Sequence, residues 1–205
     1  MFLTRRTALL GLSATLLSAC VGGGTFETVY DPVPPDLAKG WRLAGVRVSV
    51  PKTLTVSEAK KLLPDADIVW REDPPGDRHA QVGKIIQTAV QSGAQGLRGP
   101  RPVIIEVTVT RFHALTFEAE LSANDWGVHN IDFTARVLDA GSGAVLLPAT
   151  AIRAELPALS GTRMSEARSR GVTQKSMIIG HVSKTVAGWL GLGPDNRGKF
   201  SRQGN

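Results

Sequence analysis

Apolar and polar residues alternate along several stretches of the chain, as strands with one buried face require. Val46, Val48 and Val50 alternate with polar neighbours, and similar alternation covers residues 101–111 and 128–138. The turn-forming run at residues 139–143 predicts that residues 128–155 form a hairpin. A shorter strand is predicted for residues 66–71.

Helical spacing of apolar residues appears in two other stretches. Residues 78–95 carry their apolar side chains on one helical face, with Asp77 as the predicted N-cap. A second stretch, residues 162–190, has helical periodicity and can break at Gly171. A short helix is also predicted for residues 57–63, ending at Pro64. Together these elements predict an α+β fold: an antiparallel sheet of about four to five strands with two main helices packed on one face.

The order of segments predicts one domain between two tails. Residues 1–19 are interpreted as a signal peptide and residues 20–39, rich in Gly and Pro, as a tether. Residues 40–190 hold the hydrophobic pattern and are predicted to form the single domain. The polar, Gly-containing residues 191–205 are predicted to be a flexible tail.

The first residues have the order of a secretory leader. Arg5 and Arg6 precede an apolar run from Thr7 to Leu17, which ends in small residues before Cys20. As a helix, this run would be only about 16 Å long and could not span a hydrocarbon core of about 30 Å.

The sequence Leu17-Ser18-Ala19-Cys20 resembles the lipobox of bacterial lipoproteins. The resemblance implies cleavage between Ala19 and Cys20, diacylglyceryl transfer to the Cys20 thiol and acylation, for example with palmitate, of the new amino group. Cys20 is the only cysteine in the chain. Because several acyl chains bind a bilayer almost permanently, the protein is expected to be anchored to a membrane.

Two further features bear on export and location. Thr4-Arg5-Arg6 resembles a twin-arginine signal, although Ala8 stands where that signal has a large apolar residue, so twin-arginine and general secretion both stay open. Val21 follows the cysteine where inner-membrane lipoproteins often carry aspartate. By that family rule, the expected location is the periplasmic face of the outer membrane, with the inner membrane as the alternative.

The net charge of +6 is concentrated near the C-terminus. Residues 153–205 contain nine Lys or Arg and three Asp or Glu. Arg163, Arg168 and Arg170 are therefore candidates for contact with an anionic surface, with a solvated polar face as the alternative. Nucleic acid is not expected as a partner of an exported lipoprotein.

No motif in the sequence predicts catalysis, a cofactor or a metal site. A nucleophile elbow, a P-loop and a zinc-protease motif are all missing. His113, His129 and Asp132 match no metal-ligand spacing, and Glu118 and Glu120 are interpreted as a chance pair of carboxylates. We therefore expect no catalytic residues, no cofactor and no enzymatic activity.

The stretches PDADIVWREDPPGDR, VTVTRFHALTF and ARVLDAGSGAVL are similar to those of a small uncharacterised family of Gram-negative envelope lipoproteins. Residues 137–146 also resemble hairpins in auxiliary lipoproteins of envelope transport systems. The resulting hypothesis is a non-catalytic binding or assembly module with an envelope protein as partner. The alternatives are a lipid or small-molecule carrier accessory to envelope transport and, less favoured, an envelope hydrolase.

Overall fold

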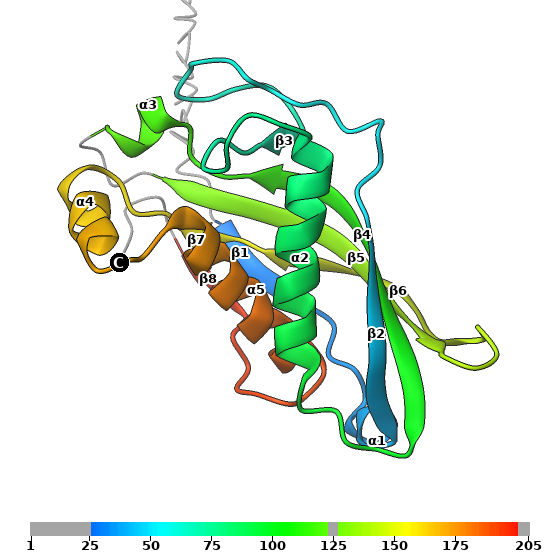
Figure 1. Ribbon diagram of the computed structural model, residues 1–205. Coiled ribbons are helices and arrows are strands. Elements are labelled where there is room, and N and C mark those ends of the chain that lie inside the picture. The colour runs from blue at the N-terminus through cyan, green and yellow to red at the C-terminus, as the bar shows by residue number, and fades with distance from the viewer. Residues whose placement is uncertain (1–25, 123–126, 201–205) are drawn as a thin grey trace, which may run out of the picture.

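The computed structural model describes residues 26–122 and 127–200 (Figure 1). In chain order, the elements are β1 (Phe26–Tyr30), α1 (Pro35–Lys39), β2 (Trp41–Ser49), β3 (Ile68–Val69), α2 (Arg78–Ala94), β4 (Arg101–His113), α3 (Phe117–Glu120), β5 (Val128–Asp139), β6 (Val145–Ala154), β7 (Leu156–Pro157), α4 (Gly161–Ser169), α5 (Gln174–Trp189) and β8 (Gly198–Phe200).

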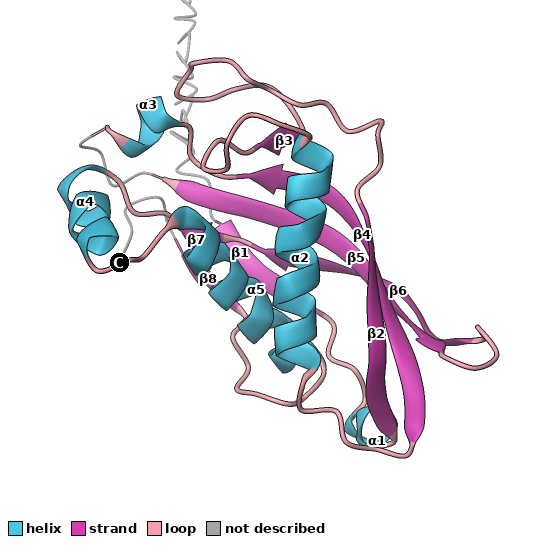
Figure 2. Cartoon of the chain, viewed as in Figure 1, coloured by secondary structure: helices cyan, strands magenta, loops and turns pink. Residues whose placement is uncertain are grey.

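The strands form one eight-stranded mixed sheet (Figure 2). Its order is β2-β4-β5-β6-β1-β8, with β3 beside the end of β4 and β7 beside the start of β5. β2 and β3 run parallel to β4, whereas the pairs β4–β5, β5–β6, β1–β6, β1–β8 and β5–β7 are antiparallel.

The predicted antiparallel sheet of four to five strands was wrong. The chain leaves β2, passes through β3 and the 17-residue helix α2, and returns as β4. Such a long crossover brings the chain back to the starting end of the sheet, so β4 runs in the same direction as β2. The predicted hairpin of β5 and β6 is present, with Phe133 opposite Ile152.

The two longer helices lie against the sheet and against each other (Figure 1). The inward stripes of α2 and α5 are almost fully buried, as their spacing predicted: Val82, Ile86, Val90, Ile178, Val182, Val186 and Trp189. Alternate residues of β4 and β5, among them Ile105 and Phe133, complete the same core. Asp77 caps α2 as predicted, because its side chain accepts a hydrogen bond from the Ala80 amide.

Both predicted tails contain parts of the sheet. Residues 26–30, assigned to the tether, form β1, which pairs with β6 and β8. Residues 198–200, assigned to the flexible tail, form β8, and the rings of Phe26 and Phe200 stack with centroids 5.8 Å apart. Residues of the predicted tether and tail thus take part in the sheet, because β1 and β8 pair with strands that are far away in the sequence.

Two other sequence predictions change in detail. The stretch 162–190 forms two helices, α4 and α5, and Gly171 lies between them with a φ of 78°. Residues 57–63 are not helical. The segment starts beside β3, where Val56 bridges to Ile68 and the Ser57 amide donates to the Ile68 carbonyl. Within the described residues, no helix is both long enough and apolar enough to cross a membrane.

Candidate functional site

An open strand edge lies at the β2 end of the sheet. One side of β2 pairs with β4 up to Ser49, which lies opposite Thr108. On its other side, among the described residues, the only bridge joins Arg42 to Arg98. In residues 26–122 and 127–200, no strand therefore pairs with the outer side of the backbone from Gly45 to Ser49. Such an edge is a template for another extended chain.

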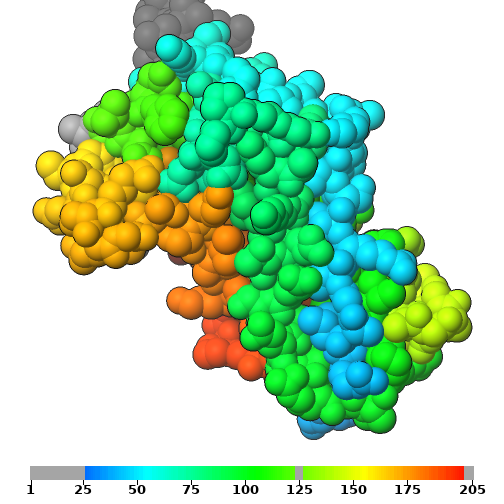
Figure 3. Space-filling view, in the orientation of Figure 1, coloured from blue at the N-terminus to red at the C-terminus, as the bar shows by residue number. Residues whose placement is uncertain are grey.

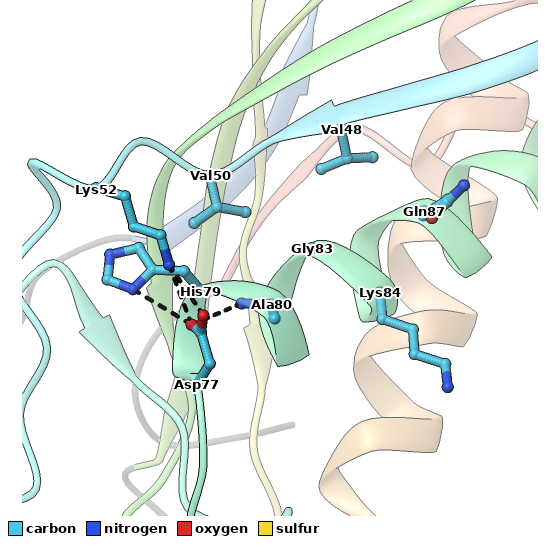
Figure 4. Close-up of a pocket in the computed structure, with 9 residues that line it drawn as sticks. All are labelled: Val48, Val50, Lys52, Asp77, His79, Ala80, Gly83, Lys84 and Gln87. Carbon is cyan, nitrogen blue, oxygen red and sulfur yellow. Dashed lines mark hydrogen bonds and ion pairs between the residues drawn. The ribbon is translucent and has the colours of Figure 1, made fainter.

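A groove of about 530 Å³ runs beside this edge, between β2 and α2 (Figure 4). Val48 and Val50 form one wall of the groove, and the first half of α2 forms the other. The full lining is Val48, Val50, Lys52, Asp77, His79, Ala80, Gly83, Lys84 and Gln87.

Gly83 keeps the groove open. A Cβ atom added at Gly83 would lie 3.5 Å from Cγ2 of Val50, which is an ordinary packing distance. A larger side chain at this helical position would therefore occupy the groove without colliding with the backbone. A glycine within a helix costs about 1 kcal/mol relative to alanine, and here it coincides with the hollow.

Most charged groups in the groove are paired with one another. Asp77 accepts from Nζ of Lys52 at 3.0 Å and from the Ala80 amide at 3.1 Å. The amide and then the lysine hold the pKa of the Asp77 carboxyl below its usual value. Lys84 is exposed and forms no ion pair with any described residue, so its ammonium is available to a ligand.

His79 is held in place by two neighbours. Its Nε2 lies 3.1 Å from the Leu54 carbonyl oxygen, and its Nδ1 lies 3.8 Å from Oδ1 of Asp77. The lining contains no Ser, Thr or Cys that this imidazole could activate. Within the described part of the chain, the groove thus combines a strand edge without a partner, two valines and the ammonium of Lys84, which forms no ion pair there. An extended peptide could bind to these features.

A second hollow, of about 380 Å³, lies near α3 and is mostly apolar. Its lining is Phe26, Leu62, Leu63, Pro64, Val69, His113, Ala114, Leu115, Ala119, Ser122, Gly127, Val128 and Asn130. His113 is the titratable group in this lining, and its Nε2 bonds to the Ala66 carbonyl. Burial lowers the pKa of His113, which favours the neutral ring.

The three arginines considered for an anionic surface do not act as one exposed group. Arg168 forms ion pairs with Glu120 and Glu72, at 2.8 and 2.9 Å. Its guanidinium thereby joins α4 to α3 and to the segment before α2. Arg163 and Arg170 are exposed on and just after α4. Ala19 and Cys20 lie outside the described residues.

The histidines and Asp132 do not converge. His129 is fully buried, and neither of its ring nitrogens has a hydrogen-bond partner among the described residues. Asp132 lies on the other face of β5, where its carboxylate is 4.0 Å from Nε of Arg153. His113 bonds to the loop before β3. No group of three His, Cys, Asp or Glu side chains in residues 26–122 and 127–200 is arranged to hold a metal ion.

Sequence reasoning missed the groove because the crossover that places α2 beside β2 was not foreseen. The available signal was Gly83, a glycine in the middle of a strongly amphipathic helix. The sequence predicts a strand for Val48 and Val50, but no pattern in the neighbouring residues indicates that this strand forms the edge of the sheet.

Residues 41–205 match a family described as a family of unknown function (DUF6778). No curated protein matches the chain.

Similar solved structures include two of the PelC dodecamer from Paraburkholderia phytofirmans, one of them a single-residue variant. The variant is 15% identical, with 78% of this chain and 93% of that chain covered and a TM-score of 0.34. The other is 10% identical, with 80% and 97% covered and a TM-score of 0.31. A candidate lipoprotein from Caulobacter crescentus CB15 is 18% identical, with 53% and 82% covered and a TM-score of 0.28. Likeness at these scores carries no inference about function or assembly.

Proposed function

The chain belongs to this family of unknown function (DUF6778), and we propose that it is a non-catalytic binding module of the cell envelope. In this proposal, a lipid on Cys20 anchors the protein to the periplasmic face of the outer membrane. The observation that carries the binding role is the free edge of β2 beside the groove of Figure 4.

The proposed partner is an extended polypeptide segment that adds a strand to β2. Its backbone would pair with the outer side of residues 45–49, and alternate side chains would enter the groove. This mode takes affinity from main-chain hydrogen bonds and specificity from the side-chain pockets. Val48 and Val50 favour small apolar groups, while the unpaired ammonium of Lys84 favours an acidic residue.

The absence of catalysis is part of the proposal. His79 and Asp77 are engaged with Leu54, Lys52 and the start of α2. General acid or base catalysis needs a titratable group within reach of a reacting atom. In the groove, no Ser, Thr or Cys side chain lines the space beside His79. The lipid anchor would then raise the effective concentration of the module near partners in the membrane.

Site-specific photocrosslinking in intact cells tests the binding role. A photoreactive residue at Gln87, exposed in the groove, should give one discrete adduct of the full chain. The same residue at Val145, on β6 and three strands along the sheet from β2, should not give that adduct. Equal adducts from both positions, or none from Gln87, would contradict the proposed site.

A second candidate function, a carrier of lipid or another small apolar molecule, is favoured by the hollow near α3. Its volume of about 380 Å³ falls within the range of small-molecule sites, and its lining is mainly apolar. Mass spectrometry of the intact protein under non-denaturing conditions distinguishes the two functions. A carrier retains a bound molecule in addition to the covalent lipid, whereas the proposed module carries the covalent lipid alone.

A further inference from the structure

Four large apolar side chains are exposed at the α3 end of the domain. Leu62 and Leu63 are 58% and 79% exposed, and Phe117 and Leu121 are 46% and 81% exposed. The first two lie in the segment between β2 and β3, and the other two lie on and just after α3. We call these four residues the leucine surface.

The two halves of the leucine surface are held together by direct contacts. The Thr116 hydroxyl, at the N-cap of α3, donates a hydrogen bond of 2.8 Å to the Lys61 carbonyl. Leu62 and Leu63 also share the lining of the hollow near α3 with Ala119 and Ser122. In the space-filling view, the atoms of both segments lie next to each other at one end of the molecule (Figure 3).

The expected lipid anchor is close to this end. Phe26, the first residue of β1, lines the same hollow as Leu62 and Leu63. Cys20 precedes Phe26 by six residues, so even a fully extended chain places it within about 22 Å of Phe26. A lipid on Cys20 would therefore hold this end of the domain near the bilayer.

We propose that the leucine surface rests on the lipid bilayer and fixes the orientation of the anchored domain. This inference relies on the anchor of the proposed function but not on its groove. Exposed leucines and a phenylalanine on one face are typical of proteins that dip apolar side chains into the interfacial region of a membrane. The proposal also explains why these four apolar side chains stay exposed among the described residues.

Apolar contact, not charge, drives the proposed binding of the leucine surface to the bilayer. Lys60 and Lys61 are exposed directly before the leucines. Asp65 is exposed nearby and Glu118 lies on α3, so the positive charges are offset. The leucine surface should therefore bind to neutral phosphatidylcholine vesicles as well as to vesicles that contain phosphatidylglycerol. Arg168, which is paired with Glu120, plays no part in it.

Spin labelling of the full lipidated chain tests this orientation. Leu63→Cys, Leu121→Cys and, as the control on the β5–β6 hairpin, Val145→Cys would each carry one nitroxide. In phosphatidylcholine vesicles, labels at 63 and 121 should be several-fold more accessible to oxygen than to a water-soluble nickel complex. The label at 145 should show the opposite preference.

Three results separate the possible failures. Labelling of the unsubstituted protein would show a free Cys20 thiol and would overturn the anchor itself. If the unsubstituted protein takes up no label but the labels at 63 and 121 are more accessible to nickel than to oxygen, the anchor stands and the leucine surface is overturned. Low accessibility to both oxygen and nickel would mean that a protein covers these residues, which also contradicts the proposal.

A second variant provides an independent check. Leu62→Ser combined with Leu63→Ser should move the label at 121 toward the aqueous pattern, because the remaining surface is too small to stay inserted. Both leucines are exposed, so the fold should tolerate the change. An unchanged label at 121 would contradict a cooperative leucine surface.

Discussion

The guanidinium of Arg168 donates two hydrogen bonds to the carboxylate of Glu120. Nε reaches Oε1 and Nη2 reaches Oε2, both at 2.8 Å, while Nη2 also reaches Glu72. The Glu120 side chain is almost buried, and that of Arg168 is 35% exposed. The pair therefore connects α3 to α4, and Gln174 at the start of α5 joins it by donating to Glu120.

Arg168→Glu should destabilise the domain by roughly 1–3 kcal/mol, because it leaves the Glu120 carboxylate without its partner and adds a like charge. Arg170→Glu is the matched control, since Arg170 is exposed. That change should alter the free energy of unfolding by less than about 0.5 kcal/mol. Urea denaturation of both variants measures the difference. Equal stabilities would show that the Arg168 contacts contribute nothing.

Acid should destabilise the domain through the buried His129 and the half-buried His181. Burial lowers the pKa of His129 to about 3 and that of His181 to about 4, against 6.5 for the unperturbed ring. At a pH between the lowered pKa of each ring and 6.5, the unfolded chain binds more protons than the folded one. The free energy of unfolding should therefore fall as the pH drops below about 6.5. Above pH 7 neither group contributes to the pH dependence.

His129→Leu removes one of these groups and its two unpaired nitrogens. The free energy of unfolding, measured by urea titration from pH 7.5 to 4, should therefore depend less steeply on pH in the variant. The same slope in variant and parent would contradict the assignment of acid sensitivity to His129.

Gly93 sets the distance between α2 and α5. A Cβ atom there would lie 2.4 Å from the Ser183 carbonyl oxygen and 2.8 Å from Cβ of Val186. Gly93→Ala should therefore force the helices apart and cost roughly 1–3 kcal/mol, despite the higher helix propensity of alanine. Gly180→Ala, where nothing lies within 4 Å, should stabilise the protein slightly. Thermal melts of the two variants should shift in opposite directions.

The lipid anchor makes a separate prediction. Cys20→Ser should prevent acylation and leave the leader attached, because the thiol is the proposed site of diacylglyceryl transfer. Intact-mass spectrometry of membrane-extracted protein should show a lipidated N-terminus at Cys20 in the parent only. Cleavage at another position, or an unmodified thiol, would contradict the lipobox interpretation.

Local patterns in the sequence predicted the elements better than their arrangement. The alternation of Val103, Ile105, Val107 and Val109 identified β4, and the capping residue Asp77 identified the start of α2. These signals are local because the burial of a strand or helix face repeats every two or every three to four residues. The direction of a strand and the identity of its neighbours in the sheet produce no such period in the sequence.

The missed features depend on contacts between distant residues. β1 looked like a tether because glycines and prolines flank it, yet Thr28 lies opposite Ala154 in β6. The sequence presents Arg168 as a candidate for contact with an anionic surface, because its partners Glu72 and Glu120 precede it by 96 and 48 residues and are not local neighbours. The β2 groove likewise exists only once the crossover has placed α2 beside the strand edge.

Two glycine variants, compared by the same crosslinking from Gln87, show whether a partner binds in the groove. Gly83→Gln fills the groove of Figure 4, whereas Gly180→Gln changes an exposed glycine in α5. Both changes should raise helix stability by up to about 1 kcal/mol, so neither should unfold the domain. The adduct from Gln87 should be lost with Gly83→Gln and kept with Gly180→Gln. An adduct that survives Gly83→Gln in full would contradict the groove as the binding site.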